Sequence, residues 1–226
     1  MVAKRVGIFG GTFDPPHLGH LLLAETIREQ FELDEVLFVP CNEPPHKDRA
    51  DLTAAMHRYA MVVAVTLHNP AFTPAAVEVN RPGKSYSIDT VRTLAAQYGP
   101  DTELYFVAGL DSMLQLDSWH EPEALLDSCN VVVVSRPGSS FEQLRDVLPE
   151  RCHERIVDAS GGQDVAGETD GLRIYLSDAV YLALSSTELR QRVRSGLGIR
   201  YRVTPEVERY IKSHELYQAQ VTEVAS

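Results

Sequence analysis

Short apolar runs alternate along this chain with segments of helical period. Four runs rich in β-branched residues and bounded by turn residues predict buried strands at residues 5–9, 35–39, 104–108 and 130–134. Helical spacing predicts helices at 18–31, 53–67, 88–98, 141–147, 187–195 and 205–213. Because the strands alternate with helices and are apolar almost throughout, the sequence predicts an α/β fold with a doubly wound parallel sheet and right-handed crossovers.

The pattern shows no internal repeat and no linker, so we expect a single domain over residues 1–226 with a core at about 5–215. Residues 159–171 are rich in glycine and acidic residues and predict a mobile surface loop. Thr204 and Pro205 predict the start of a C-terminal helix whose apolar face packs on the sheet, and we expect the tail after Tyr217 to be frayed.

Charge and cysteine content narrow the function classes. The chain has 226 residues with 21 basic and 32 acidic side chains, and its net charge of −11 argues against extended nucleic acid as a partner. Three cysteines without C-x-x-C spacing indicate reduced thiols rather than a disulfide framework or a zinc site. The first apolar run is too short for a signal peptide and no stretch is long enough to span a membrane, so we expect a cytoplasmic protein.

The segment with the richest chemistry follows the first predicted strand. It reads GGTFDPPHLGH from Gly10 to His20 and leads into the first predicted helix. Ligands of open α/β sheets bind at the carboxyl ends of strands, and a helix start offers free N–H groups to an anion. His17 and His20 project from one side of the first turn, and Gly19 between them is expected to leave room for a phosphate. Taken singly, the glycines also fit a tight turn and the histidines a structural pair.

A second segment reads LSSTELR from Leu184 to Arg190. Ser185 and Glu188 fit a capping box, or Ser186 is the cap, so a well-capped helix accounts for part of the pattern. Five arginines and no acid lie between Leu189 and Pro205 in a chain that is otherwise strongly acidic. Arg190 in the first turn would place a planar cation beside an anion site, which suits a triphosphate.

Together the two segments resemble the paired signature of the HxGH nucleotidylyltransferase superfamily, and the GGTFDPPHxGH form resembles that of bacterial nicotinate-nucleotide adenylyltransferases. Four further segments are similar to that family's: PPHK at residues 44–47, SYSIDT at 85–90, GLD at 109–111 followed by Trp119, and RPG at 136–138. The resemblance covers about residues 5–215. Ser87 replaces the usual threonine, Leu184 replaces the usual isoleucine, and the 159–171 loop has no counterpart.

The resemblance implies transfer of the adenylyl group of ATP to nicotinate mononucleotide, giving deamido-NAD and pyrophosphate in NAD biosynthesis. Its phosphate nucleophile is already an anion, so catalysis rests on alignment and charge stabilisation. By family resemblance, His17, His20 and Arg190 are catalytic. The implied nucleotide- and substrate-binding residues are Gly10, Gly11, Thr12, Phe13, His46, Lys47, Ser85, Ser87, Gly109, Asp111, Trp119, Arg136, Ser186 and Thr187.

Judged from the residue types alone, three of these assignments have alternatives. Lys47 also fits a solvated surface lysine, Trp119 a core residue and Asp111 a helix cap. We expect His17, His20, Lys47, Arg136 and the arginines after Thr187 to converge as a local positive site. Mg²⁺ is expected to bind ATP oxygens, with no metal ligands from the protein.

Three rival functions remain open. The acceptor of the reaction is also compatible with nicotinamide mononucleotide or phosphopantetheine. A nucleotide-binding regulator without turnover would have no chemical need for both histidines and Arg190. A nucleic-acid-binding module is disfavoured because Tyr201 is the one aromatic side chain within the basic segment. The expected partners are therefore small molecules, with no nucleic acid and no membrane, in a monomer or homodimer.

Overall fold

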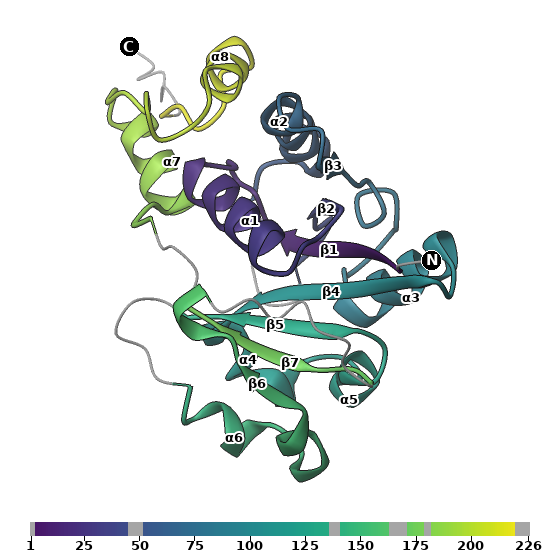
Figure 1. The fold of residues 1–226 in the computed structure, drawn as a ribbon. Helices are drawn as coiled ribbons and strands as arrows, with labels where there is room; N and C mark the ends of the chain where they lie inside the picture. Colours follow the sequence, from purple (N-terminus) through teal and green to yellow (C-terminus); the bar gives the residue numbers. More distant parts are fainter. Residues whose placement is uncertain (1–2, 45–51, 136–140, 163–170, 179–181, 220–226) are drawn as a thin grey trace, which may run out of the picture.

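Seven parallel strands form one sheet in the computed structural model, which describes residues 3–44, 52–135, 141–162, 171–178 and 182–219 (Figure 1). The strands are β1 (Lys4–Gly11), β2 (Glu35–Pro40), β3 (Phe72–Pro74), β4 (Thr102–Gly109), β5 (Asn130–Val134), β6 (Ile156–Asp158) and β7 (Ile174–Ser177). Their order across the sheet is β3-β2-β1-β4-β5-β7-β6. The predicted doubly wound parallel sheet is confirmed, and all four predicted strands are present.

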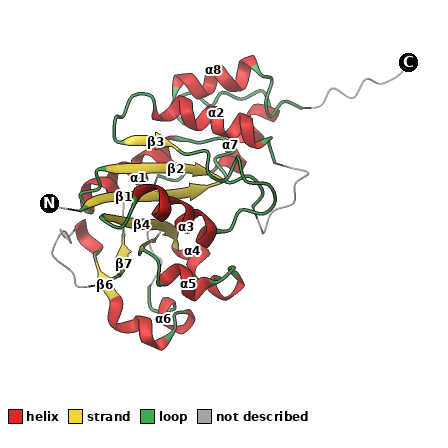
Figure 2. Cartoon of the chain, turned by 90° about the vertical axis from the view of Figure 1, so that its right-hand side faces the viewer, coloured by secondary structure: helices red, strands yellow, loops and turns green. Residues whose placement is uncertain are grey.

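The described α-helices lie on both faces of the sheet or beside it (Figure 2). They are α1 (Leu18–Gln30), α2 (Ala55–Thr66), α3 (Ser87–Tyr98), α4 (Leu110–Met113), α5 (Pro122–Leu126), α6 (Leu144–Val147), α7 (Ser186–Arg194) and α8 (Pro205–Ser213). Each of the six predicted helices is found. The one predicted at 141–147 begins later, at Leu144, and α4 and α5 were missed because they span only four and five residues.

Alternation along the strands divides the core in two. Val6 and Ile8 of β1 face one apolar cluster with α3, α4, α5 and α6, whereas Phe9 faces a second cluster with α1 and α2. The same alternation recurs in β7, where Ile174 belongs to the first cluster and Tyr175 to the second. Strands buried on both faces are the hallmark of a parallel sheet covered by crossover helices, as the apolar runs predict.

A third apolar cluster lies outside the two sheet faces and corrects one prediction. Val207 and Ile211 of α8 pack against Met61 and Val65 of α2, together with Leu189 of α7. The C-terminal helix therefore packs on α2, whereas the sequence analysis expected it to pack on the sheet. The apolar stripe of α8 was read correctly, but helical spacing does not tell which element covers it.

The segment predicted as a surface loop at 159–171 begins inside the protein. Ala159 is fully buried and its carbonyl accepts a hydrogen bond from the Gln30 side chain at 2.6 Å. A single 3₁₀ turn follows at Ser160–Gly162, and residues 163–170 lie outside the described part of the chain. The flanking strands β6 and β7 were missed because three and four residues are too few for a periodic signal.

Candidate functional site

Strand order reverses between β1 and β4, and the first motif lies at that point. From β1 the chain proceeds outward to β2 and β3, whereas β4 leads to the other half of the sheet. The carboxyl ends of these two neighbours carry Gly10 and Gly11 on β1 and Gly109 on β4. A crevice outside the carboxyl ends at a switch point is the usual ligand site of such sheets. At Gly10 and Gly109 an added Cβ would meet no atom of the described residues within 4 Å, so these residues leave both backbones open to a ligand.

The turn after β1 is built around the Phe13 ring. Phe13 has a left-handed φ of 49° and is 2% exposed, and its ring packs edge-on against Phe9 at 5.6 Å between centroids. A Cβ at Gly11 would lie 3.1 Å from the Phe13 ring. Gly11 is therefore needed for this packing, in addition to the freedom to bend that the sequence suggested. The result is a sharp turn whose main chain lies at the carboxyl edge of the sheet.

The two histidines are stacked at the start of α1. His17 is the N-cap, and its ring lies 3.6 Å from that of His20 with the planes 20° apart. The His17 backbone N–H donates to Nδ1 of His20 at 3.1 Å. Because Nδ1 of His20 accepts this bond, the neutral ring carries its proton on Nε2. His20 is thereby oriented as a hydrogen-bond donor, and the predicted projection from one side of the helix is confirmed.

Burial keeps both imidazoles neutral near pH 7. It lowers the pKa of His17 from 6.5 to about 4. The pKa of His20 is also held well below its usual range, first by burial and then by the neighbouring His17. Nδ1 of His17 is buried and has no hydrogen-bond partner among the described residues. A buried ring nitrogen without a partner is costly unless a ligand completes it.

Gly19 lies against the His17 ring. A Cβ at Gly19 would lie 3.1 Å from Nδ1 of His17 and 3.3 Å from the carbonyl oxygen of Leu182. The sequence analysis expected Gly19 to leave room for a phosphate. The structure shows that its missing side chain makes room for the His17 ring.

The second motif docks onto the first, although 171 and 176 residues separate the paired positions. The Ser186 hydroxyl donates to the carbonyl of Pro15 at 2.8 Å, and Nη1 of Arg190 donates to the carbonyl of Asp14 at 2.7 Å. Ser185 caps α7 by accepting from the Glu188 N–H at 3.1 Å, which decides between the two capping serines. The starts of α1 and α7 therefore lie at one site.

Arg190 is held in place from two sides. Besides the Asp14 carbonyl, Nη2 donates to the Thr187 hydroxyl at 3.3 Å, and the side chain is 19% exposed. The other arginines of this segment do not all join it. Nε of Arg192 donates to the Gly198 carbonyl at 3.0 Å, and Arg200 forms an ion pair with Glu208 at 3.8 Å. The expected convergence of the arginines after Thr187 is therefore wrong for these two.

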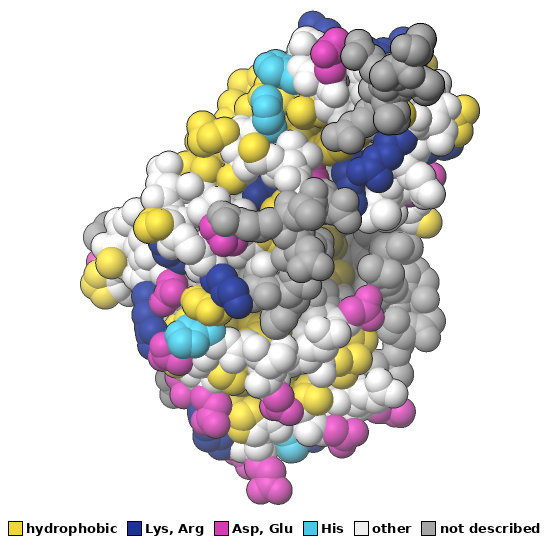
Figure 3. All heavy atoms as spheres, turned by 180° about the vertical axis from the view of Figure 1, so that it is seen from behind, with side chains coloured by type: hydrophobic (Ala, Val, Ile, Leu, Met, Phe, Trp, Pro, Cys, Tyr) yellow, Lys and Arg dark blue, Asp and Glu magenta, His cyan; other side chains and the backbone are white. Residues whose placement is uncertain are grey.

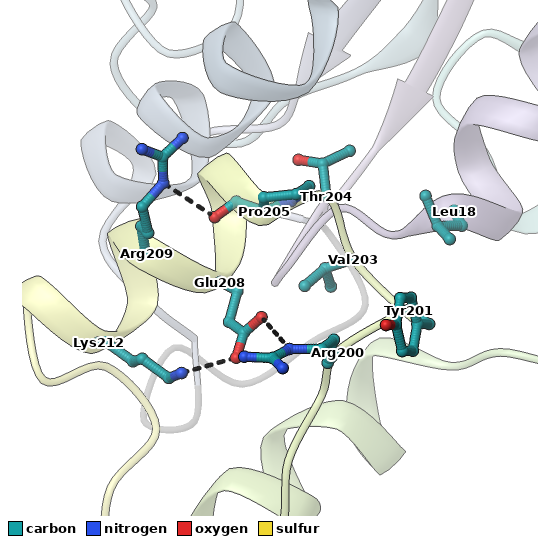
Figure 4. A pocket seen from close by; sticks show the side chains of 9 residues that line it. All are labelled: Leu18, Arg200, Tyr201, Val203, Thr204, Pro205, Glu208, Arg209 and Lys212. Carbon is teal, nitrogen blue, oxygen red and sulfur yellow. Dashed lines mark hydrogen bonds and ion pairs between the residues drawn. The ribbon is translucent and has the colours of Figure 1, made fainter.

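The groove beside α8 is lined by three cations, Arg200, Arg209 and Lys212, and by one carboxylate, Glu208 (Figure 4). Its volume is about 450 Å³, and Leu18 at the start of α1 is one of its lining residues. Glu208 projects into it between Lys212, at 2.6 Å, and Arg200. On the face of the molecule shown in Figure 3, most Asp and Glu side chains lie in the lower half. The candidate site is defined by oriented hydrogen-bond donors at the first motif and not by a broad basic surface.

Two residues of this site escaped the sequence analysis. Asp14 is 2% exposed, and its Oδ1 accepts from the Tyr217 hydroxyl at 2.7 Å while Oδ2 accepts from the Thr53 N–H at 3.3 Å. Burial and the Asp14 carboxylate raise the pKa of Tyr217. Tyr217 is therefore anchored to the first motif, and residues 220–226 of the tail that was expected to be frayed lie outside the described residues. Asp14 was within the quoted motif, but nothing in the sequence marks its pairing with a residue 203 positions away.

The predicted acceptor-side residues gather at the other half of the crevice. The Ser85 hydroxyl accepts from the Asn42 N–H at 3.0 Å, and Ser87 is the first residue of α3. The Tyr86 ring lies 4.4 Å from that of His120, next to Trp119. The structure therefore brings the 85–87 turn to the segment that carries Trp119.

Trp119 combines the two interpretations that the sequence left open. It is half-buried and meets Phe106 of β4 edge-on at 6.0 Å, so it belongs to the margin of the core while keeping an exposed part. Asp111 is the second residue of α4, whose N-cap is Gly109, so the alternative of a helix cap is wrong for Asp111. His46, Lys47 and Arg136 lie outside the described residues, and their predicted roles stay predictions.

Comparison with known proteins first defines a class. A model of the cytidylyltransferase-like family matches residues 8–192, which include both docked motifs. Two solved structures of the Plasmodium falciparum nicotinic acid mononucleotide adenylyltransferase share the fold. They are its complexes with NaAD (TM-score 0.71, 20% identity) and with APC (TM-score 0.69, 19% identity), and each covers 95% of this chain and 97% of that one.

Relatives at higher identity define the family within that class. A protein named probable nicotinate-nucleotide adenylyltransferase from Thermoanaerobacter sp. (strain X514) is 39% identical over 95% of this chain and 94% of its own. One of the same name from Geobacter sulfurreducens is 41% identical over 94% of this chain and 98% of its own. The chain belongs to the nicotinate-nucleotide adenylyltransferase family. No helix within the described ranges is long and apolar enough to cross a membrane.

Burial of the histidine pair predicts a pH-dependent stability. The unfolded chain binds a proton on His17 near pH 6.5, whereas the folded protein does so only near pH 4. The free energy of unfolding therefore falls as pH drops from 6.5 towards 4, by up to about 1.4 kcal/mol per pH unit for this group. Urea unfolding of His17→Asn across that window should show a shallower fall. His68→Asn, whose side chain is 78% exposed, is the control, and an unchanged slope in His17→Asn would contradict the assignment.

The Tyr217 anchor predicts a specific loss of stability. Tyr217→Phe removes the hydroxyl and leaves Oδ1 of the buried Asp14 without this donor. We expect the free energy of unfolding to fall by about 1–2 kcal/mol in urea titrations. Tyr201→Phe is the matched control because Tyr201 is 86% exposed. Equal effects of the two substitutions would show that the anchor contributes nothing.

Proposed function

We propose that this protein transfers the adenylyl group of ATP to nicotinate mononucleotide, releasing pyrophosphate. The observation that carries the proposal is the docking of the Ser186–Arg190 segment onto Asp14 and Pro15 at the switch point of the sheet. Two helix starts, two neutral imidazoles and one guanidinium then face the crevice where such sheets bind nucleotides. The family's relatives carry the name of this activity.

The geometry supports catalysis by positioned donors. The attacking phosphate is already an anion, so the reaction needs alignment and stabilisation of negative charge rather than a base. In the proposal, Nε2–H of His20 donates to the α-phosphate as charge builds on its oxygens. His17, which has a buried nitrogen without a partner, bonds the neighbouring phosphates. Neutral imidazoles suit this role because each has one N–H that donates a hydrogen bond without a positive charge on the ring.

Arg190 and the start of α7 complete the phosphate side. Arg190 is assigned to the β- and γ-phosphates, since two bonds fix its guanidinium beside the first motif. Ser186 and Thr187 lie in the first turn of α7, where free N–H groups favour an anion. The main chain of Gly10, Gly11, Thr12 and Phe13 is assigned to the nucleotide, and His46, Lys47 and Arg136 keep their family-derived binding roles.

Acceptor recognition is assigned to the opposite half of the crevice. The pyridine ring is placed against Trp119, whose partial exposure leaves a face for stacking. Main-chain groups near Ser85 and Ser87 would receive the carboxylate, since N–H donors suit a carboxylate better than a carboxamide. Gly109 and Asp111 at the end of β4 are assigned to the ribose side.

Mg²⁺ is the metal ion that we propose for the reaction. Within the described ranges, no group of three His, Cys, Asp or Glu side chains is placed to hold a metal. Mg²⁺ takes most of its ligands from phosphate oxygens and water when it binds with nucleotides. When bound, it supplies charge neutralisation of the triphosphate. We further propose a cytoplasmic monomer or homodimer without nucleic-acid or membrane partners.

An acceptor comparison tests the proposal. With ATP and Mg²⁺ held constant, pyrophosphate release should be fastest with nicotinate mononucleotide and slower with nicotinamide mononucleotide or phosphopantetheine. The physical reason is the carboxylate, which N–H donors near Ser87 can satisfy directly. Faster release with another acceptor would change the substrate assignment. ATP binding without release under any acceptor would instead favour a regulator.

His20 offers a sharper test of the catalytic step. His20→Ala removes the donor assigned to the α-phosphate, and we expect a loss of about 3 kcal/mol in transition-state stabilisation, or roughly 10² to 10³ in kcat. Steady-state pyrophosphate release measures the loss, and circular dichroism checks that the fold is retained. His57→Ala controls for removal of an imidazole, since His57 bonds Tyr210 at the α2–α8 contact. Undiminished turnover of His20→Ala would remove His20 from the mechanism.

A further inference from the structure

A fully buried arginine underlies the first motif without belonging to it. Arg58 of α2 is 0% exposed, and each nitrogen of its guanidinium donates to a backbone carbonyl. Nη1 bonds Thr12 at 2.8 Å, Nη2 bonds Asn42 at 3.0 Å and Nε bonds Thr53 at 2.8 Å. Removing a charge from water is expensive, and a core position of this size is often filled at least as well by an apolar side chain. Packing alone therefore does not explain why an arginine occupies this core position.

Its three acceptors lie in segments that border the proposed site. Thr12 follows β1 and Asn42 follows β2, and these two strands are hydrogen-bonded neighbours. Thr53 precedes α2. Arg58 therefore ties the carboxyl ends of two adjacent strands to the helix that covers them. A planar guanidinium can do this because its donors lie on three nitrogens in a fixed fork, whereas the three donors of an ammonium share one nitrogen.

The bond to Thr12 also sets the direction of the next amide. In a trans peptide the carbonyl and the following N–H point in opposite directions. With the Thr12 carbonyl held towards Arg58, the Phe13 N–H is turned away from α2. Within the described ranges, no backbone carbonyl accepts from that N–H. The left-handed φ of Phe13 is a conformation that an L-residue keeps only when its surroundings enforce it.

The bond to Asn42 extends the connection to the acceptor side. The Asn42 carbonyl accepts from Arg58, and its N–H donates to the Ser85 hydroxyl at 3.0 Å. Ser85 is 8% exposed and lies in the turn that starts α3. One chain of hydrogen bonds therefore runs from the turn after β1, through Arg58, to the turn assigned to the nicotinate carboxylate.

We propose that Arg58 is a positioning residue for adenylyl transfer, which holds the Thr12 carbonyl inward so that the Phe13 amide donates to a phosphate of bound ATP. It touches neither substrate and acts through the backbone of the two turns. This inference rests on the proposed function for its kinetic effect, whereas the orientation of the Phe13 amide is testable with a nucleotide alone.

The chain contains a matched control in Arg155. Its Nε donates to the Leu172 carbonyl at 2.9 Å, Nη2 donates to the Leu126 carbonyl, and the side chain is 18% exposed. Both arginines also approach a cysteine sulfur, Cys41 at 3.7 Å for Arg58 and Cys152 at 3.8 Å for Arg155. Arg155 ties α5 to the segment before β7, away from both motifs. Its hydrogen bonds hold α5 and the segment before β7 together and involve no residue of the candidate site.

The kinetic test compares Arg58→Lys with Arg155→Lys. Each keeps the charge and much of the volume while losing the fork. We expect Arg58→Lys to lower kcat by on the order of 10²-fold, because displaced groups near the reacting atoms reduce rate at this scale. The KM values should change much less than kcat. Arg155→Lys should lower the melting temperature while keeping kcat close to the wild-type value. Equal kcat values in Arg58→Lys and wild type, or equal kcat losses in the two variants, would overturn the proposal.

A second measurement reads the Phe13 amide directly, and its wild-type half tests the contact with nucleotide even if Arg58→Lys fails to fold. Selective ¹⁵N labelling of phenylalanine, with Phe13→Leu for assignment, reports on the Phe13 amide. Saturation with α,β-methylene-ATP should shift this resonance in wild type and not in Arg58→Lys. An unshifted wild-type resonance, or the same shift in both proteins, would refute the positioning role. Wild-type pyrophosphate release is scored separately, so a failure of the proposed function is distinguished from a failure of this inference.

Discussion

The hydrogen bonds from Arg190 and Ser186 to the carbonyls of Asp14 and Pro15 are the contacts on which the candidate site depends. They join two segments from opposite ends of the chain at the carboxyl end of β1. The third apolar cluster supports this junction, because Leu189 of α7 packs there against Met61 of α2. Without that cluster, α7 would have no apolar partner, and its first turn would not be fixed beside α1. Packing of the C-terminal helices on α2 is therefore part of how the site is assembled.

The electrostatics of the site follow from burial more than from net charge. The chain carries a net charge of −11, and in the groove beside α8 Glu208 pairs with two of the three cations. At the histidine pair, burial lowers the pKa of both rings, so the α1 start offers N–H donors without positive charge. Arg190 is then the permanent cation among the described residues of the two motifs. A site of this kind recognises an anion by oriented donors and stays compatible with an acidic surface.

Much of the fold was predictable because its signals are local. Apolar runs marked β1, β2, β4 and β5, and helical spacing marked α1, α2, α3, α7 and α8. Strands β6 and β7 escaped because three or four residues carry no period, and the burial of β7 comes from neighbours distant in sequence. In the site, both histidines and Arg190 were identified by resemblance. Arg58 and Tyr217 were not, since each acts through a partner that only the tertiary structure brings near.

Hydrogen bonds to backbone carbonyls hold the parts of this site together, alongside one ion pair between Arg190 and Asp14 at 4.0 Å. Arg190 bonds the Asp14 carbonyl, Ser186 that of Pro15, and Arg58 those of Thr12 and Asn42. A carbonyl acceptor persists through substitution of its own side chain, so these contacts constrain the donor far more than the residue that accepts. Asp14 differs, because its side chain also accepts from Tyr217 and Thr53. It follows that at Asp14 both the main chain and the side chain form hydrogen bonds that position the site.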